Sequence, residues 1–207
     1  MSTTTALRIG LADNGRAMTL EEYEDAEAEE GYRYELARGV LEVSEVPGES
    51  HGLIVCAFYD AVAAYRRAHP NVIFRYGGGS EFQLWLPALI SGRNPDVAVA
   101  LRNTPKDDRG FSPPALAIEV VSEGAEARRR DYETKREEYL AFGLREYWVV
   151  DPADRRVTVL IRAGDTWIER VFQGEQAAEG LVLPGFAVPL AELWVAQADQ
   201  IGDPQED

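Results

Sequence analysis

The sequence is poor in several residue types, and each scarcity excludes a class of protein. The single cysteine, Cys56, rules out a disulfide within the chain. Because Cys56 stands among apolar neighbours, we expect a buried small side chain rather than a reactive thiol. The only two histidines, His51 and His69, lie in no known signature of a zinc site or of a Ser-His-Asp triad, so neither kind of site is expected.

Long apolar runs are also lacking. The longest, over residues 53–65, contains Asp60 and falls short of the roughly 18–20 residues that cross a bilayer. The N-terminus has no basic stretch followed by an apolar core, as a secretory signal would have. No phosphate-binding GxxxxGK[ST] or dinucleotide-binding GxGxxG motif occurs either. We therefore expect a cytoplasmic protein that uses no membrane and no organic cofactor.

Basic residues are outnumbered, with 21 Lys and Arg against 36 Asp and Glu and a formal charge of −15. The excess acid is concentrated at 19–49, with 11 acids and 2 bases, and at 192–207, with 5 acids and no base. Residues 50–191 hold 17 bases and 19 acids, so the charge does not exclude a DNA partner. It predicts DNA binding that is weak without metal and falls quickly with salt.

The length and the pattern of apolar residues predict one domain. We expect a flexible leader over 1–17, a single domain over 18–195 and an acidic tail over 196–207. Helices are expected at 20–30, after a capping box of Thr19 and Glu22, at 51–68 and at 125–142. Strands are expected at 34–36, 40–43, 72–76, 81–86, 96–101, 115–121 and 146–151, with a C-terminal hairpin over 157–162 and 167–172. This order predicts an α/β or α+β fold, a mixed β-sheet flanked by helices.

Two acidic residues occupy positions where a carboxylate is costly. Glu119 lies inside the apolar run 116–122, and a buried carboxylate normally pairs with a cation or binds a metal. Asp96 opens another strand directly after Pro95. Alternation would let both carboxylates face one side of neighbouring strands, where a hard cation such as Mg²⁺ or Mn²⁺ would bring them together. The alternatives are a buried ion pair with an arginine for Glu119 and a strand-cap or turn role for Asp96.

Lys135 is one of only two lysines in the chain and lies in the helix expected after Glu119. Asp131 and Tyr139 stand at helical spacing on either side of it. A lysine near a metal-bound water can orient that water and stabilise the charge that develops on a phosphate. The alternative is a solvated lysine paired with Asp131.

These motifs together resemble the PD-(D/E)XK nuclease superfamily and, more narrowly, the bacterial Uma family of restriction-endonuclease-like proteins. The resemblance covers about residues 18–195. It rests on motifs whose order and spacing match: Tyr34-Glu35-Leu36 with Gly39, His51, Asn94-Pro95-Asp96, Ile118-Glu119-Val120, Asp131-(x)3-Lys135-(x)3-Tyr139 and Gly143-(x)2-Glu146-(x)-Trp148-(x)2-Asp151-Pro152.

The resemblance implies a restriction-endonuclease-like fold whose metal ligands are Asp96, Glu119 and the main-chain carbonyl of Val120. Glu35 would be the extra carboxylate that often joins this site. The usual lysine position, two residues after the glutamate, holds Val121 here. The Uma-type pattern moves the lysine to the following helix, which makes Lys135 the candidate.

The supporting residues implied by the resemblance are Asp131, Tyr139 and His51, with direct metal binding by His51 as the less favoured alternative. The function expected is a Mg²⁺- or Mn²⁺-dependent endonuclease that acts on DNA as a homodimer. One alternative is a non-catalytic dimeric scaffold of the same fold in a defence or mobile-element system. Another is hydrolysis of a small phosphate ester by the same residues.

Overall fold

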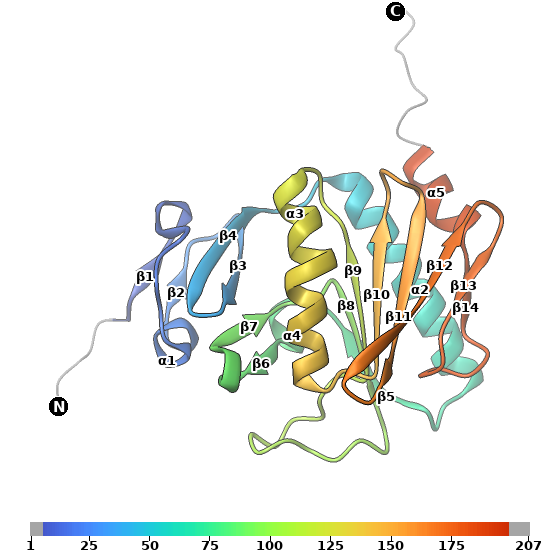
Figure 1. Ribbon diagram of the computed structural model, residues 1–207, viewed down its shortest axis with the longest axis horizontal. Helices are drawn as coiled ribbons and strands as arrows, with labels where there is room; N and C mark the ends of the chain where they lie inside the picture. The colour runs from blue at the N-terminus through green and yellow to red at the C-terminus, as the bar shows by residue number, and fades with distance from the viewer. Residues whose placement is uncertain (1–5, 199–207) are drawn as a thin grey trace, which may run out of the picture. The chain divides into compact units, whose positions relative to one another are not determined.

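The computed structural model describes residues 6–198 and divides them into two compact units (Figure 1). The first unit contains the chain up to Pro47 together with Gln83–Asn94, and the second contains Gly48–Phe82 and the chain from Pro95 onward. These boundaries differ from the single domain over 18–195 that we expected. The expected leader is also part of the first unit from residue 8 on, because Ile9 is 3% exposed and packs in its core. Most of the expected acidic tail lies outside the described residues.

The first unit is built on a four-stranded sheet in the order β4-β3-β7-β6. Its elements are β1 Arg8–Ile9, η1 Leu11–Asp13, α1 Leu20–Glu24, β2 Glu27–Ala28, β3 Tyr32–Ala37, β4 Val40–Glu45, β6 Leu84–Leu86, η3 Pro87–Leu89 and β7 Ser91–Arg93. Helix α1 starts with the predicted capping box, in which the Thr19 hydroxyl accepts the Glu22 N–H at 3.1 Å and the Glu22 carboxylate accepts the Thr19 N–H at 2.8 Å. The helix ends at Glu24, earlier than expected, because the chain then forms β2 beside β1.

The second unit is built on a six-stranded mixed sheet in the order β12-β11-β10-β9-β8-β5. Its strands are β5 Ile73–Gly77, β8 Val97–Leu101, β9 Leu116–Val120, β10 Glu146–Asp151, β11 Arg156–Ala163 and β12 Thr166–Gln173, with a separate pair β13 Ala177–Glu179 and β14 Ala187–Pro189. Strands β9 and β10 run parallel, and every residue in them is buried, as expected for central strands. Strands β11 and β12 form the predicted hairpin around Gly164, whose φ is 64°.

Helices cover both faces of this sheet (Figure 1). They are α2 Glu49–Ala68, η2 Gly79–Phe82, α3 Ala125–Arg129, the π-helical turn η4 Arg130–Thr134, α4 Lys135–Phe142 and α5 Leu190–Ala198. The main core packs α2 against β8, β9 and β10 through residues such as Phe58, Ile118 and Trp148. Because side chains alternate along a strand, Glu119 and Tyr147 face the other side, toward α4. No helix in residues 6–198 is long and apolar enough to cross a membrane.

Two local expectations are wrong. The expected burial of Cys56 is not found, because this side chain is exposed. The buried stripe of α2 contains Ile54 and Phe58, and Cys56 lies two residues from each, about 200° around the helix. The strand expected over 81–86 begins only at Leu84, since the preceding residues form the turn η2.

Candidate active site

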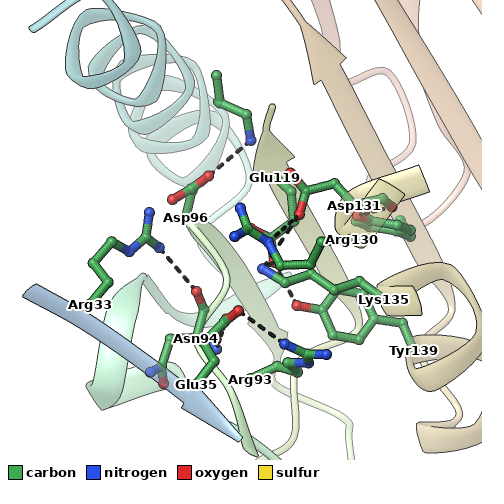
Figure 2. A network of polar contacts seen from close by, with 12 residues as sticks. Arg33, Glu35, Arg93, Asn94, Asp96, Glu119, Arg130, Asp131, Lys135 and Tyr139 are labelled. Atoms are coloured by element: carbon green, nitrogen blue, oxygen red, sulfur yellow. Dashed lines mark hydrogen bonds and ion pairs between the residues drawn. The ribbon is translucent and has the colours of Figure 1, made fainter. Parts of the chain in front are cut away.

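The pairing of two strands sets the positions of the two predicted metal ligands. Strands β8 and β9 are antiparallel, with Val97 opposite Ile118. One step beyond this pair, Asp96 and Glu119 therefore lie on neighbouring segments of the second unit (Figure 2). Both are buried, at 8% and 2% exposed. The register makes the two residues neighbours in the sheet, and a cation shared by their carboxylates stays a prediction.

Glu119 is held by two side chains from helix α4. The ammonium Nζ of Lys135 lies 2.9 Å from Glu119 Oε1, and the Tyr139 hydroxyl donates to the same oxygen at 2.6 Å (Figure 2). Lys135 and Tyr139 stand one turn apart on α4, so both reach one carboxylate. Lys135 is 2% exposed, which excludes the alternative of a solvated lysine. Glu119 is thus in a buried ion pair. Its partner is Lys135 and not an arginine, the commoner partner in buried ion pairs.

Asp131 extends this group toward the π-helical turn. Its Oδ1 lies 3.7 Å from Lys135 Nζ and 3.2 Å from the Nε of Arg130. Its main-chain carbonyl accepts the Tyr147 hydroxyl at 2.8 Å. Burial, followed by the charges of Asp131 and Glu119, raises the pKa of Tyr147 well above its usual value of 10.0. Tyr147 therefore stays a neutral donor at physiological pH.

Asp96 belongs to a second group of contacts, which includes His51 at the start of α2. Asp96 Oδ2 accepts the Val120 N–H at 2.9 Å and lies 3.2 Å from His51 Nε2. The same Nε2 lies 3.1 Å from the Val120 carbonyl oxygen. Because a carbonyl oxygen only accepts, Nε2 must carry the ring hydrogen in this arrangement. The Tyr59 hydroxyl donates to the Asp96 carbonyl at 3.0 Å and ties α2 to the same segment.

Glu35 lies in the first unit, where its carboxylate has partners of its own. Oε2 is 3.2 Å from NH1 of Arg93, and Oε1 accepts the Asn94 N–H at 2.8 Å (Figure 2). Arg93 is 0% exposed and also pairs with Glu42 at 2.6 Å. The role of Glu35 as an additional ligand of the metal site therefore stays a prediction.

The oxygens in the second unit fit a hard cation in part. Asp96 Oδ2 and the Val120 carbonyl oxygen both lie within hydrogen-bond distance of His51 Nε2. A carboxylate and a carbonyl are the kind of ligands that Mg²⁺ takes together with several waters. Glu119 Oε1 instead faces Lys135. Within residues 6–198, no group of three or more His, Cys, Asp or Glu side chains has the arrangement of a metal site.

Three residues that support these groups were not expected from the sequence. Arg130 pairs with Asp131, Tyr147 supports the Asp131 carbonyl, and Tyr59 supports Asp96. Of these three residues, only Tyr147 could have been found from the sequence, because strand alternation puts it on the sheet face opposite the buried Trp148. His51 contacts two predicted ligands, Asp96 and the Val120 carbonyl, and its supporting role stays a prediction.

Comparison with known proteins agrees with this architecture. No functionally curated protein matches the chain. Among solved structures, the chain is similar to a crystal structure of a putative nuclease belonging to DUF820 from Anabaena variabilis, with 15% sequence identity and a TM-score of 0.66, over 86% of this chain and 98% of that one. This likeness confirms the expected fold. The model of the Uma2 family, described as putative restriction endonuclease, matches residues 20–191. The chain belongs to the Uma2 family.

Proposed function

We propose that this protein is a divalent-metal-dependent endonuclease that hydrolyses phosphodiester bonds in DNA. The observation that carries the proposal is the contact of 2.9 Å between Lys135 Nζ and Glu119 Oε1. Val121 stands where the related nucleases have their lysine, so hydrolysis needs a lysine from elsewhere. Lys135 reaches the glutamate from helix α4 and can take that place.

In this proposal Asp96, Glu119 and the Val120 carbonyl hold Mg²⁺ or Mn²⁺. The bound ion would supply a polarised water and offset negative charge on the phosphate. Lys135 brings a buried positive charge beside Glu119, where it can orient the attacking water and stabilise developing charge. Tyr139 fixes the Glu119 carboxylate through its hydroxyl. The family resemblance names Glu35 as a further carboxylate, and a substitution tests that expectation.

Conservative substitutions test these roles. We expect Asp96→Asn, Glu119→Gln and Lys135→Met each to lower metal-dependent cleavage of plasmid DNA by roughly 100-fold or more, because each removes charge that acts on the transition state. Glu35→Gln should have a smaller effect.

The control is Lys106→Ala, because Lys106 is the only other lysine and is exposed. It should cleave at the parental rate. Parental cleavage by both Asp96→Asn and Glu119→Gln, in the presence of Mg²⁺, would refute the assignment. Comparison with a model phosphodiester would show whether DNA or a small ester is the better substrate.

A second candidate function is a non-catalytic scaffold that works as a homodimer. Strand β12 favours it, because β12 is the last strand of the six-stranded sheet and exposes Ile168 and Val171 at 54% and 46%. Such an edge is able to pair with another chain. Calorimetric titration separates the two candidates, since binding of neither Mg²⁺ nor Mn²⁺ at millimolar levels would favour the scaffold. Light scattering on the purified protein would measure its oligomeric state.

A further inference from the structure

The imidazole of His51 contacts two oxygens of the proposed metal site. Nε2 lies 3.2 Å from Asp96 Oδ2 and 3.1 Å from the Val120 carbonyl oxygen. The side chain is 13% exposed, so it is enclosed but still reachable by solvent. The neighbouring contact between the Tyr59 hydroxyl and the Asp96 carbonyl holds the same helix against the same segment. These contacts together hold the first half of α2 against the segments that carry Asp96 and Val120.

These distances match the spacing of ligand atoms around one ion. Nitrogen and oxygen ligands stand at about 2.0–2.2 Å from a small divalent metal, so neighbouring ligands at right angles are about 3 Å apart. Nε2 already has this separation from both oxygens. Only the ring hydrogen would have to move from Nε2 to Nδ1 to expose the lone pair on Nε2.

We propose that His51 Nε2 is a direct ligand of the metal and that the site prefers ions that accept imidazole, such as Mn²⁺ and Ni²⁺, over Mg²⁺. The inference rests on the proposed metal-dependent function and adds the class of metal. Imidazole is a good ligand for the later divalent transition metals, whereas Mg²⁺ strongly favours oxygen. A site in which one imidazole nitrogen joins the carboxylates and the carbonyl of the proposed metal site should therefore discriminate between them.

The alternative is that His51 only links Asp96 to Val120 by hydrogen bonds. His51→Gln distinguishes the two, because the Gln amide can still donate a hydrogen bond but lacks the imidazole nitrogen. His51→Ala removes both the hydrogen-bond donor and the imidazole nitrogen. His69→Ala is the matched control, since His69 is the only other histidine and is exposed at the far end of the same helix.

The experiment is calorimetric titration of the full chain with Ni²⁺, Mn²⁺ and Mg²⁺, together with pulsed EPR of the Mn²⁺-loaded protein. The parent and His69→Ala should bind Ni²⁺ at least tenfold more tightly than Mg²⁺ and show coupling of Mn²⁺ to a ring nitrogen. His51→Gln and His51→Ala should lose that coupling and bind Ni²⁺ roughly 10- to 100-fold more weakly, with little change for Mg²⁺. Circular dichroism shows which of the two His51 variants fold. The metal binding of either variant tests the proposal, provided that this variant is folded.

The possible failures are distinguishable. Retention of the nitrogen coupling and of Ni²⁺ affinity in His51→Gln would overturn the role of His51 and leave the proposed endonuclease intact. A parent protein that binds none of the three ions would overturn the proposed function and this inference together.

Discussion

Glu146 is 1% exposed, and its buried carboxylate accepts three N–H groups. Oε1 accepts the Trp148 indole N–H at 2.8 Å, and Oε2 accepts the backbone N–H groups of Leu181 and Val182 at 2.5 and 3.0 Å. Gly180 lets the chain approach this closely, because an added Cβ would lie 1.9 Å from Glu146 Oε1. The residue belongs to the motif that suggested the family, but these contacts give it a structural role, in which it joins β10 to the segment before β14.

We expect Glu146→Ala to lower the free energy of unfolding by about 3 kcal/mol or more, because it leaves three N–H donors without their acceptor. Urea unfolding followed by circular dichroism measures this change. Glu169→Gln is the control, since Glu169 forms a half-exposed ion pair with Arg136 and should change stability by less than about 1 kcal/mol. Equal urea midpoints for Glu146→Ala and the parent would contradict the structural role.

At the scale of elements, the helix expected over 125–142 is divided by the π-helical turn η4 Arg130–Thr134. Such a turn contains one residue more than an α-helical turn. The main-chain carbonyl of Asp131, in this turn, accepts the Tyr147 hydroxyl. Sequence periodicity could not predict this interruption, because polar and apolar residues keep nearly the same spacing through it. This contact comes from β10, 16 residues further along the chain.

Two glycines in helices provide an opposed pair of substitutions. Gly143 ends α4 with a φ of 91°, whereas Gly52 lies inside α2 with ordinary helical geometry. An added Cβ would meet no atom within 4 Å at either position. Gly143→Ala should therefore destabilise the protein by about 1 kcal/mol through backbone strain alone. Gly52→Ala should stabilise it by about 0.5–1 kcal/mol through helix propensity.

Thermal or urea unfolding of both variants would check the signs. Stabilisation by both substitutions would mean that the left-handed end of α4 has no energetic importance. Destabilisation by both would mean that Gly52 is required for something other than its place in a helix.

At the scale of the whole molecule, buried tyrosines set an alkaline limit to stability. Burial, with the charge of Glu35, raises the pKa of Tyr23 above its usual 10.0, and the pKa of Tyr147 is raised as described above. Because both values are higher in the folded state, folding binds the phenolic protons more tightly. The resulting stability is fully present below about pH 10 and is lost as pH rises through the folded values.

We therefore expect the urea midpoint to be nearly constant between about pH 8 and 9.5 and to fall above about pH 10. Tyr147→Phe should cost about 1 kcal/mol at neutral pH, since it removes the hydrogen bond to Asp131, and should reduce the alkaline loss. An alkaline loss as steep in this variant as in the parent would show that Tyr147 is not responsible.

Much of the fold was predictable because local patterns carry it. The capping box at Thr19 and the C-terminal hairpin both depend on residues close in sequence, and both are found. The end of α1 and the exposure of Cys56 were not predictable in this way. Each depends on which distant segment packs against the element.

The chemical groups of this protein can be read from the order of its residues: a carboxylate in a central strand, another at a strand entrance, and a lysine that follows them on a helix. How these groups meet depends on the packing of the folded chain. It placed Lys135 on Glu119, and it brought His51 to a carbonyl 69 residues away and to Asp96, 45 residues away. Helical and strand periods arise from neighbours within a few residues, whereas strand register and the direction of a side chain result from packing between segments far apart in sequence.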